Sequence, residues 1–220
     1  MSMYKDMNPA ITEILLSVPR DWQTPATMYP EGSVGDAEIV RDFYPRGYYR
    51  MERVGGYVLW YNHYRIPVTE LKIRGQTVMV DDPLHWIGMQ RLAEASVGNT
   101  LVAGLGLGLV VHALARNSRV TRIDVVEIEP DVVKLIAPHL PRDPRVRVHE
   151  GNAFTWRGEY DTVIVDLLVR DEPTAPTVIA GGQTPISADE LYHRFSAQHP
   201  NARVYLWGVR DPTINPAVEP

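Results

Sequence analysis

Thr100-Leu-Val-Ala-Gly-Leu-Gly-Leu-Gly-Leu-Val110 joins a short apolar run to three alternating glycines and then to a helix-forming segment. The apolar run predicts a buried strand that ends near Ala103. The glycines at 104, 106 and 108 allow a sharp turn and a close backbone approach to a ligand, because they lack a Cβ atom. Dinucleotide-binding loops have G-x-G-x-x-G, which would need glycine where this chain has Leu109. The G-x-G-x-G spacing therefore indicates either another nucleotide-type cofactor or a plain tight turn.

Around this loop the sequence alternates strand-like and helix-like segments. We expect strands at 100–103, 121–127, 145–149, 160–166 and 202–208, and helices at 83–95, 108–117, 130–139 and 187–199, the first capped by Asp82. Strands separated by helices predict an α/β fold with a Rossmann-like, doubly wound parallel sheet. Because about a dozen residues follow residue 208, the sheet is expected to be shortened to about five strands.

The residues before this region predict a different organisation. Asn8 and Pro9 begin a capped helix that ends before Pro19, and residues 21–47 are rich in proline and glycine without a sustained period, which suggests a loop-rich segment or lid. Residues 48–81 predict a small antiparallel β meander with turns at 55–56 and 74–76. The expected division is 1–81, a Rossmann-like domain at 82–210, and a tail at 211–220.

Composition narrows the classes of function. The 220 residues have a net charge of −5 and contain no cysteine, and no apolar run approaches the ~18 residues that span a bilayer. We expect a cytoplasmic protein without disulfides, thiolate metal sites or membrane contact. Nucleic-acid binding is unsupported, because the nearest basic group, Arg142, Arg145 and Arg147, fits a solvated surface. The seven histidines lack metal-binding spacings, so no metal site is expected.

Acidic residues stand at two of the predicted strand ends. Glu127 closes the strand 19 residues after Gly108, where its two oxygens would accept hydrogen bonds from both hydroxyls of a ribose. Asp166 ends the strand that starts at Tyr160, where it would hold an amino group or accept a proton from a substrate amine. Each residue also fits a structural strand-end acid. Pro130 and Asp131 fit the start of a helix, with Glu129 at its N-cap.

The remaining strand end carries Asn152, followed by Ala153 and Phe154. Asn152 would bond the edge of an adenine ring, and the two apolar residues would contact its face. Asn152 fits a turn asparagine equally well. Four features in chain order, each at a predicted strand end, favour a ligand site over coincidence.

The order G-x-G-x-G, V-E-I-E-P-D, E-G-N-A and Y-D-x-V-I-V-D resembles the class I S-adenosylmethionine (SAM) dependent methyltransferase superfamily. More narrowly, residues 76 to 170 are similar to the spermidine synthase, or polyamine aminopropyltransferase, group. The resemblance implies SAM or decarboxylated SAM as cofactor and a small-molecule acceptor. It implies Asp166 as the catalytic residue, and cofactor contacts from Gly104, Leu105, Gly106, Gly108, Glu127, Ile128, Asn152, Ala153 and Asp166.

The sequence departs from the spermidine synthase pattern at the acids that handle the polyamine. Asp166 is followed by apolar residues up to Asp171, and His85 is followed by Trp86 where the group has a histidine-glutamate pair. Several carboxylates are needed to offset the desolvation of a polyamine. Methyl transfer is therefore favoured over aminopropyl transfer, and a non-catalytic assembly protein is a third hypothesis. The short sheet also predicts a homo-oligomer that covers its exposed edge.

Overall fold

The computed structural model describes residues 18, 20–53, 56–167 and 188–207. The predicted N-terminal helix, the loop that follows Asp171 and the tail after Arg210 lie outside these residues. In the described part of the chain, the helices are too short or too polar to cross a bilayer.

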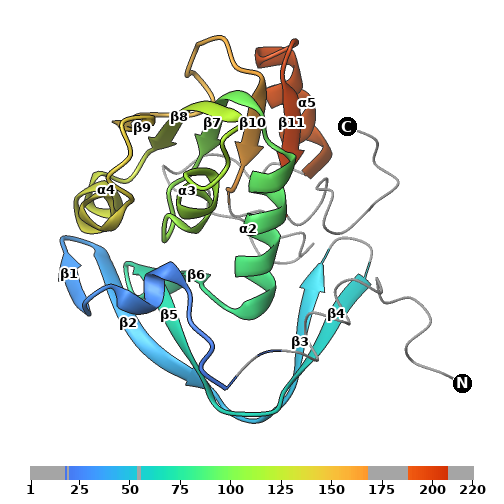
Figure 1. Cartoon of the computed structure of the whole chain (residues 1–220). Helices are drawn as coiled ribbons and strands as arrows, with labels where there is room; N and C mark the ends of the chain where they lie inside the picture. The colour runs from blue at the N-terminus through green and yellow to red at the C-terminus, as the bar shows by residue number, and fades with distance from the viewer. Residues whose placement is uncertain (1–17, 19, 54–55, 168–187, 208–220) are drawn as a thin grey trace, which may run out of the picture.

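The centre of the molecule is a five-stranded parallel sheet (Figure 1). Its strands are β7 (Gly98–Ala103), β8 (Val120–Glu127), β9 (Val146–Glu150), β10 (Thr162–Val165) and β11 (Arg203–Leu206), in the order β11-β10-β7-β8-β9. All four neighbouring pairs are parallel. The direction of strand succession reverses between β7 and β10, and in open α/β sheets such a reversal opens a ligand-binding crevice at the carboxyl ends of the strands. The predicted Rossmann-like sheet is confirmed.

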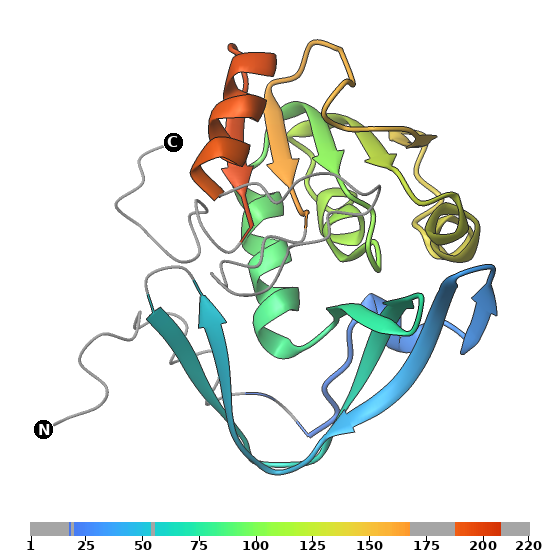
Figure 2. The same ribbon diagram turned by 180° about the vertical axis from the view of Figure 1, so that it is seen from behind.

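Separate apolar cores cover the two faces of the sheet. On one face, α2 (Pro83–Ala95), α3 (Leu109–Leu114) and α4 (Pro130–Ile136) pack against inward residues such as Val102 and Val125. On the other, α5 (Ala188–Gln198) packs on Leu101 and Val163 (Figure 2). Adjacent residues of β7 serve opposite cores because side chains alternate along a strand. Both faces are therefore buried, as the apolar strand sequences predicted.

The second face has one helix and one irregular segment among the described residues. Residues 151–161 connect β9 to β10 without a helix and place Phe154 and Tyr160 in the second core. The amide of Gln198 on α5 donates to the carbonyls of Ala153 and Trp156, the first at 3.0 Å. These contacts hold the segment in place of a crossover helix.

The N-terminal region is largely β structure, and the prediction of a loop-rich segment at 21–47 is wrong. After a 3₁₀ helix, η1 (Pro25–Met28), come β1 (Gly32–Val34) and β2 (Ala37–Tyr44). Strand β2 pairs along its whole length with β5 (Ile66–Ile73), a partner that lies far away in the sequence. Ala37 and Ile39 are buried in the first core while Glu38 is exposed. The period of two covers only the first residues of the strand and was masked by the surrounding prolines and glycines.

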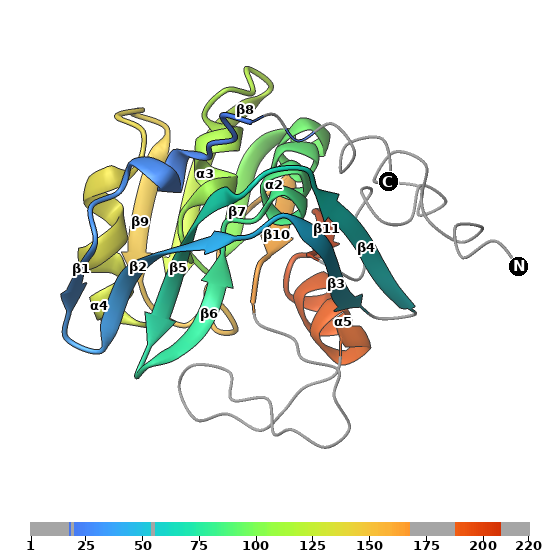
Figure 3. The ribbon, with the colours of Figure 1, turned by 90° about the horizontal axis from the view of Figure 1, so that it is seen from below.

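The predicted meander at 48–81 is antiparallel, but its connectivity differs from the prediction. β5 and β6 (Gln76–Val80) join β1 and β2 in a four-stranded sheet of order β1-β2-β5-β6, whereas β3 (Gly47–Arg53) and β4 (Gly56–Asn62) form a separate two-stranded sheet (Figure 3). The turn between β5 and β6 lies where it was predicted, with positive φ at Arg74 and Gly75. Long pairing of β2 with β5 explains the split, because it takes β5 away from β4.

The four-stranded sheet packs directly against the α/β region. Ile39, Leu71 and Met79 belong to the same apolar core as Met89 of α2 and Leu107 of the glycine loop. Helix α2 begins where predicted, with the Asp82 side chain accepting a hydrogen bond from the amide of His85 at 2.8 Å. The N-terminal sheet therefore contributes residues to the surroundings of the glycine loop. The domain boundary at 81 remains a prediction.

Candidate cofactor site at the carboxyl edge of the parallel sheet

Four neighbouring strand ends bring the predicted site residues to one edge of the sheet. Gly104 follows β7 and Asp166 follows β10, and the amide of Asp166 donates to the carbonyl of Ala103 at 2.9 Å. On the other side of β7, the Gly104 amide donates to Val126 of β8 at 3.0 Å, one residue before Glu127. Asn152 lies just beyond β9, which pairs with β8. The motifs, which are separated in the sequence, thus lie side by side at one edge of the sheet.

The three glycines are required by backbone conformation and by close packing. Their φ angles are +96°, +50° and +70° for Gly104, Gly106 and Gly108, a region that disfavours other residues. A Cβ atom on Gly104 would lie 2.5 Å from the carbonyl oxygen of Asp166, and one on Gly106 would overlap the sulfur of Met79. A Cβ atom on Gly108 would lie 2.5 Å from Leu140. Protein atoms therefore account for each glycine in the unliganded chain.

The amide hydrogens of the loop show which donor is left for a ligand. The amide of Gly104 donates to the carbonyl of Val126 at 3.0 Å, and the amide of Leu105 donates to Oε2 of Glu127 at 2.8 Å. The amide of Leu107 donates to Sδ of Met79 at 2.9 Å, and the amide of Gly108 donates to the carbonyl of Leu105 at 2.8 Å. Among the described residues, the Gly106 amide has no acceptor. Gly106 is half-buried, and an N–H in a glycine loop without a described protein acceptor is a suitable donor for a ligand oxygen.

Glu127 lies where a ribose-binding acid was expected, and it also orders the protein around it. Its side chain is 8% exposed, and its two oxygens accept hydrogen bonds from the amides of Leu105 and Glu129 at 2.8 and 2.9 Å. Each carboxylate oxygen has a second lone pair that can accept a ligand hydroxyl. Glu127 therefore couples the shape of the glycine loop to the start of α4.

Asp166 has the most strongly perturbed acidity at this edge. Burial, followed by the nearby charge of Glu127, raises the pKa of Asp166 to about 7. A carboxyl group with this pKa exchanges its proton near neutral pH, which suits a general base and favours a cationic ligand group beside it. Perturbed carboxyl groups of this kind are concentrated at functional sites.

Asn152 adopts the turn role that the sequence had left open. Its side-chain oxygen accepts a hydrogen bond from the amide of Phe154 at 2.9 Å. Ala153 and Phe154 are each 6% exposed, and the ring of Phe154 packs against Phe195 of α5 with 5.5 Å between centroids. The expectation that Phe154 contacts an adenine face is not supported, because its ring serves the second core. Ile128, half-exposed after β8, stays a predicted contact.

Residues around the start of α4 mostly follow the prediction. Pro130 is the first helical residue, and Asp131 lies in the first turn, where it accepts a hydrogen bond from the amide of Asp36 at 3.1 Å. Glu129 occupies the N-cap position without a capping hydrogen bond from its side chain, which instead pairs with Arg74 at 3.6 Å. These contacts join the β1–β2 turn, through Asp36, and the β5–β6 turn, through Arg74, to the start of α4.

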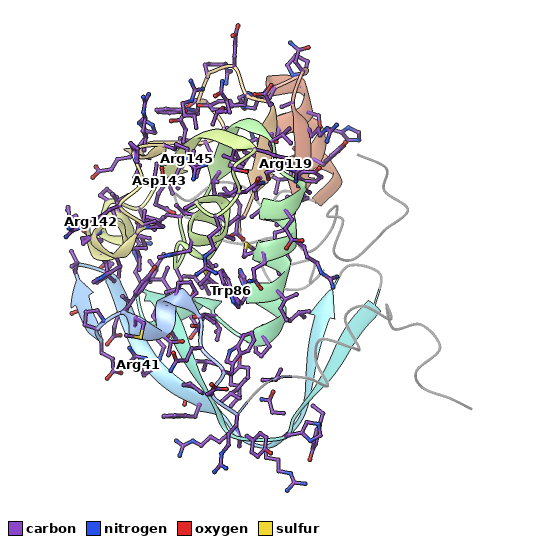
Figure 4. The ribbon with its side chains drawn as sticks, viewed as in Figure 1. Arg41, Trp86, Arg119, Arg142, Asp143 and Arg145 are labelled. Atoms are coloured by element: carbon purple, nitrogen blue, oxygen red, sulfur yellow. The ribbon has the colours of Figure 1, made fainter. Side chains whose placement is uncertain are left out.

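The basic group that was expected to be a solvated surface is only partly so. Arg145 pairs with Asp143 at 2.7 Å and donates to the carbonyls of Ala115, Asn117 and Val120, so it closes the end of α3 (Figure 4). Arg142 and Arg147 are exposed. The prediction was wrong for Arg145, since sequence spacing did not show which carbonyls lay beside it. Across the described residues, no group of three or more histidine or acidic side chains is placed to hold a metal ion.

Three residues near the loop or on α2 have roles that the motifs did not indicate. Met79 and Tyr29, both from the N-terminal region, hydrogen-bond to Leu107. Their neighbourhood depends on the docking of two sheets, so no local signal would have identified them. Trp86, which follows His85, is 6% exposed and packs in the first core (Figure 4).

This sheet order, with a glycine loop after the first strand and an acid after the second, is that of a Rossmann-like α/β fold, as in SAM-dependent methyltransferases. In sequence, part of the chain is similar to spermine synthases and polyamine aminopropyltransferases. It is 34% identical over 95 residues to a spermine synthase from Arabidopsis thaliana, covering 38% of this chain and 26% of that protein. It is 39% identical over 80 residues to a polyamine aminopropyltransferase from Alkaliphilus oremlandii, covering 32% and 28%.

The matched part is limited in extent. The chain aligns with about a quarter of the length of these two relatives. Among solved structures, a putative RNA methyltransferase from Pyrococcus horikoshii is 16% identical, with a TM-score of 0.42 over 57% of this chain and 58% of that one. No protein-family model matches the chain.

Proposed function

We propose that the chain is a SAM-dependent transferase that moves a methyl group to a small-molecule acceptor. The observation that carries this proposal is the convergence of three groups at the switch point of the sheet: the Gly106 amide, which has no acceptor in the described part of the chain, Glu127 and Asp166. The sulfonium of SAM makes its alkyl groups electrophilic, so the protein needs chiefly to align the acceptor and exclude water.

The side chains at this edge suit the parts of such a cofactor. The Gly106 amide is a donor for a carboxylate, Glu127 has lone pairs left for ribose hydroxyls, and Asp166 is placed to attract an ammonium group or to accept a proton. Asp166 is the catalytic residue of this proposal. Its pKa near 7 allows it to take a proton from an acceptor at neutral pH.

Aminopropyl transfer from decarboxylated SAM is the second candidate, and the names of the sequence relatives favour it. Methyl transfer is preferred because a polyamine needs several fixed carboxylates. Among the acids at the described edge, Glu127 already accepts two amide hydrogen bonds, Glu150 is exposed, and Leu167 follows Asp166.

Calorimetric titration with SAM, decarboxylated SAM and S-adenosylhomocysteine tests both candidates. We expect binding of SAM and of S-adenosylhomocysteine. A preference for decarboxylated SAM would replace methyl transfer by aminopropyl transfer, and no binding of any of the three up to about millimolar concentration would leave the non-catalytic assembly hypothesis.

Glu127→Ala tests the site itself. We expect it to weaken cofactor binding by about 1–3 kcal/mol, because ribose hydroxyls and the Leu105 amide lose their acceptor. Glu150→Ala is the matched control, since Glu150 is an exposed acid that lies opposite Glu127 in the β8–β9 register. Equal affinity for the wild type and both variants would place the ribose elsewhere.

A further inference from the structure

Leu107, in the middle of the glycine loop, is held on both sides by the N-terminal region. Its amide donates to the sulfur of Met79 at 2.9 Å, and its carbonyl accepts from the hydroxyl of Tyr29 at 3.1 Å. Tyr29 ends η1 and Met79 lies on β6, so the two contacts reach the loop from separate elements. The cofactor motif alone thus does not fix the conformation of this loop.

A relay of peptide groups connects Tyr29 to the unpaired donor of the loop. Tyr29 fixes the carbonyl of Leu107, and the same planar peptide carries the amide of Gly108. That amide donates to the carbonyl of Leu105 at 2.8 Å. The peptide of Leu105 in turn carries the Gly106 amide, which has no acceptor among the described residues. Rotation of the first peptide would therefore turn the group that we assign to ligand binding.

The surroundings of Tyr29 hold its hydroxyl in place. The side chain is 3% exposed, and its ring stacks on His139 with 4.8 Å between centroids. Its oxygen lies 2.9 Å from Nε2 of His112 on α3. Because the hydroxyl has one proton, donation to Leu107 leaves it to accept from His112, whose Nε2 must then carry a hydrogen.

The ionisation states of this pair limit the hydrogens available to it. Burial, and to a lesser degree Asp81, raise the pKa of Tyr29, so the phenol keeps its hydrogen and remains a donor. Burial and Arg116 lower the pKa of His112 to about 4, although a backbone hydrogen bond with His139 acts in the opposite direction. His112 is therefore neutral near pH 7, and the Tyr29 oxygen and the backbone of His139 compete for its single ring hydrogen.

We propose that Tyr29 is a positioning residue for the ligand site, acting through Leu107 to set the orientation of the Gly106 amide. The ligand in question is the cofactor of the proposed function, on which this part of the inference rests. Tyr29 touches neither cofactor nor acceptor in this scheme. Its effect is on ligand affinity and on the order of the loop.

The variant Tyr29→Phe removes the hydroxyl while keeping the ring that stacks on His139. Tyr160→Phe is the matched control, because Tyr160 is also buried and its hydroxyl also makes two hydrogen bonds, with Trp156 and Asp124, in the second core. S-adenosylhomocysteine affinity is measured by calorimetry, and amide hydrogen exchange is followed for a peptide that covers residues 104–110. Thermal unfolding of both variants reports the general loss of stability.

We expect Tyr29→Phe to weaken S-adenosylhomocysteine binding by about three- to tenfold and to speed exchange in residues 104–110 by a similar factor, the worth of one neutral hydrogen bond. Tyr160→Phe should lower the unfolding temperature at least as much without either effect. Equal changes in the two variants, or none in Tyr29→Phe, would overturn the proposal.

Two further readouts separate this inference from the proposed function. If the wild type binds none of the cofactor forms, the proposed function fails, while loop exchange in Tyr29→Phe still tests the contact between Tyr29 and Leu107. Long-range ¹H–¹⁵N NMR identifies the ring nitrogen of His112 that carries hydrogen. Hydrogen on Nε2 supports donation from Tyr29 to Leu107, and a bare Nε2 would refute it by making His112 the acceptor.

Discussion

Replacing Asp166 with asparagine should make the unliganded chain more stable at pH 8 than the wild type, at the expense of the activity that we propose. The native pKa of Asp166 is about 7 against an ordinary value of 3.8. Between these values the native state keeps a proton that the unfolded chain has lost, so the stability of the wild type falls as the pH rises from about 4 to about 7. Asparagine has a similar shape and does not ionise.

The size of the effect follows from the separation of the two pKa values. The two pKa values differ by about three units, and each unit corresponds to about 1.4 kcal/mol, so ionisation of Asp166 lowers the free energy of unfolding by about 4 kcal/mol. This loss is complete above pH 7. The cost arises from burial and from repulsion by Glu127, and a ligand ammonium group would offset it. Functional sites commonly contain groups that lower the stability of the unliganded protein, such as a buried carboxylate whose charge only the ligand neutralises.

Urea unfolding at half-unit steps from pH 4 to pH 8.5 measures this difference. The advantage of Asp166→Asn should grow from pH 4 to pH 7 and then stay constant. Asp131→Asn is the control of opposite sign, because the Asp36 amide and Lys134 lower the pKa of Asp131. That variant should be less stable than the wild type at neutral pH and equal to it in acid. A pH-independent difference for Asp166→Asn would refute the assigned ionisation.

Three further predictions concern the supports of the site. Gly106→Ala should destabilise the chain by about 1–3 kcal/mol in urea unfolding, because φ is positive and the new methyl group would overlap Met79. Adding Met79→Ala to this variant should restore part of the lost stability. If the two substitutions instead destabilise the chain additively, Gly106 and Met79 are not in contact. Arg145→Ala should cost about 2–4 kcal/mol against at most about 0.5 for exposed Arg142→Ala, and similar values would show that the carbonyl contacts are weak. Asp82→Ala should lower the free energy of unfolding, measured by calorimetry, by about 0.5–2 kcal/mol. An unchanged value would show that the capping hydrogen bond does not stabilise α2.

The parts of the fold that the sequence predicted well depend on local patterns. Helix α2 has its capping aspartate followed by proline, and the buried strands of the parallel sheet are apolar runs bounded by polar residues. Strand β2 shows the limit of such patterns. Its alternation of buried and exposed residues is incomplete, it lies in a segment rich in turn residues, and its partner β5 follows after a long separation, so only tertiary pairing defines it.

The candidate site also has some features that the sequence predicted and others that only the tertiary structure shows. The placement of Gly104, Glu127 and Asp166 at one edge of the sheet was predictable from their sequence positions, because the carboxyl ends of parallel strands must share one edge. The acidity of Asp166 was not predictable, since it depends on burial and on the distance to Glu127. The turn role of Asn152 was one of two possibilities in the sequence, and the fold shows the hydrogen bond that defines it.

The sequence by itself determined that this protein has a parallel α/β sheet with a G-x-G-x-G loop after its first strand and acids, Glu127 and Asp166, at two further strand ends. These features follow from residue periodicity and spacing, which act over a few residues. Only the tertiary structure decided how the loop is held, because Tyr29 and Met79 meet Leu107 through the packing of the N-terminal sheet against the α/β region. Hydrogen bonds and buried charges depend on distances in space, and those distances exist only once both sheets have docked.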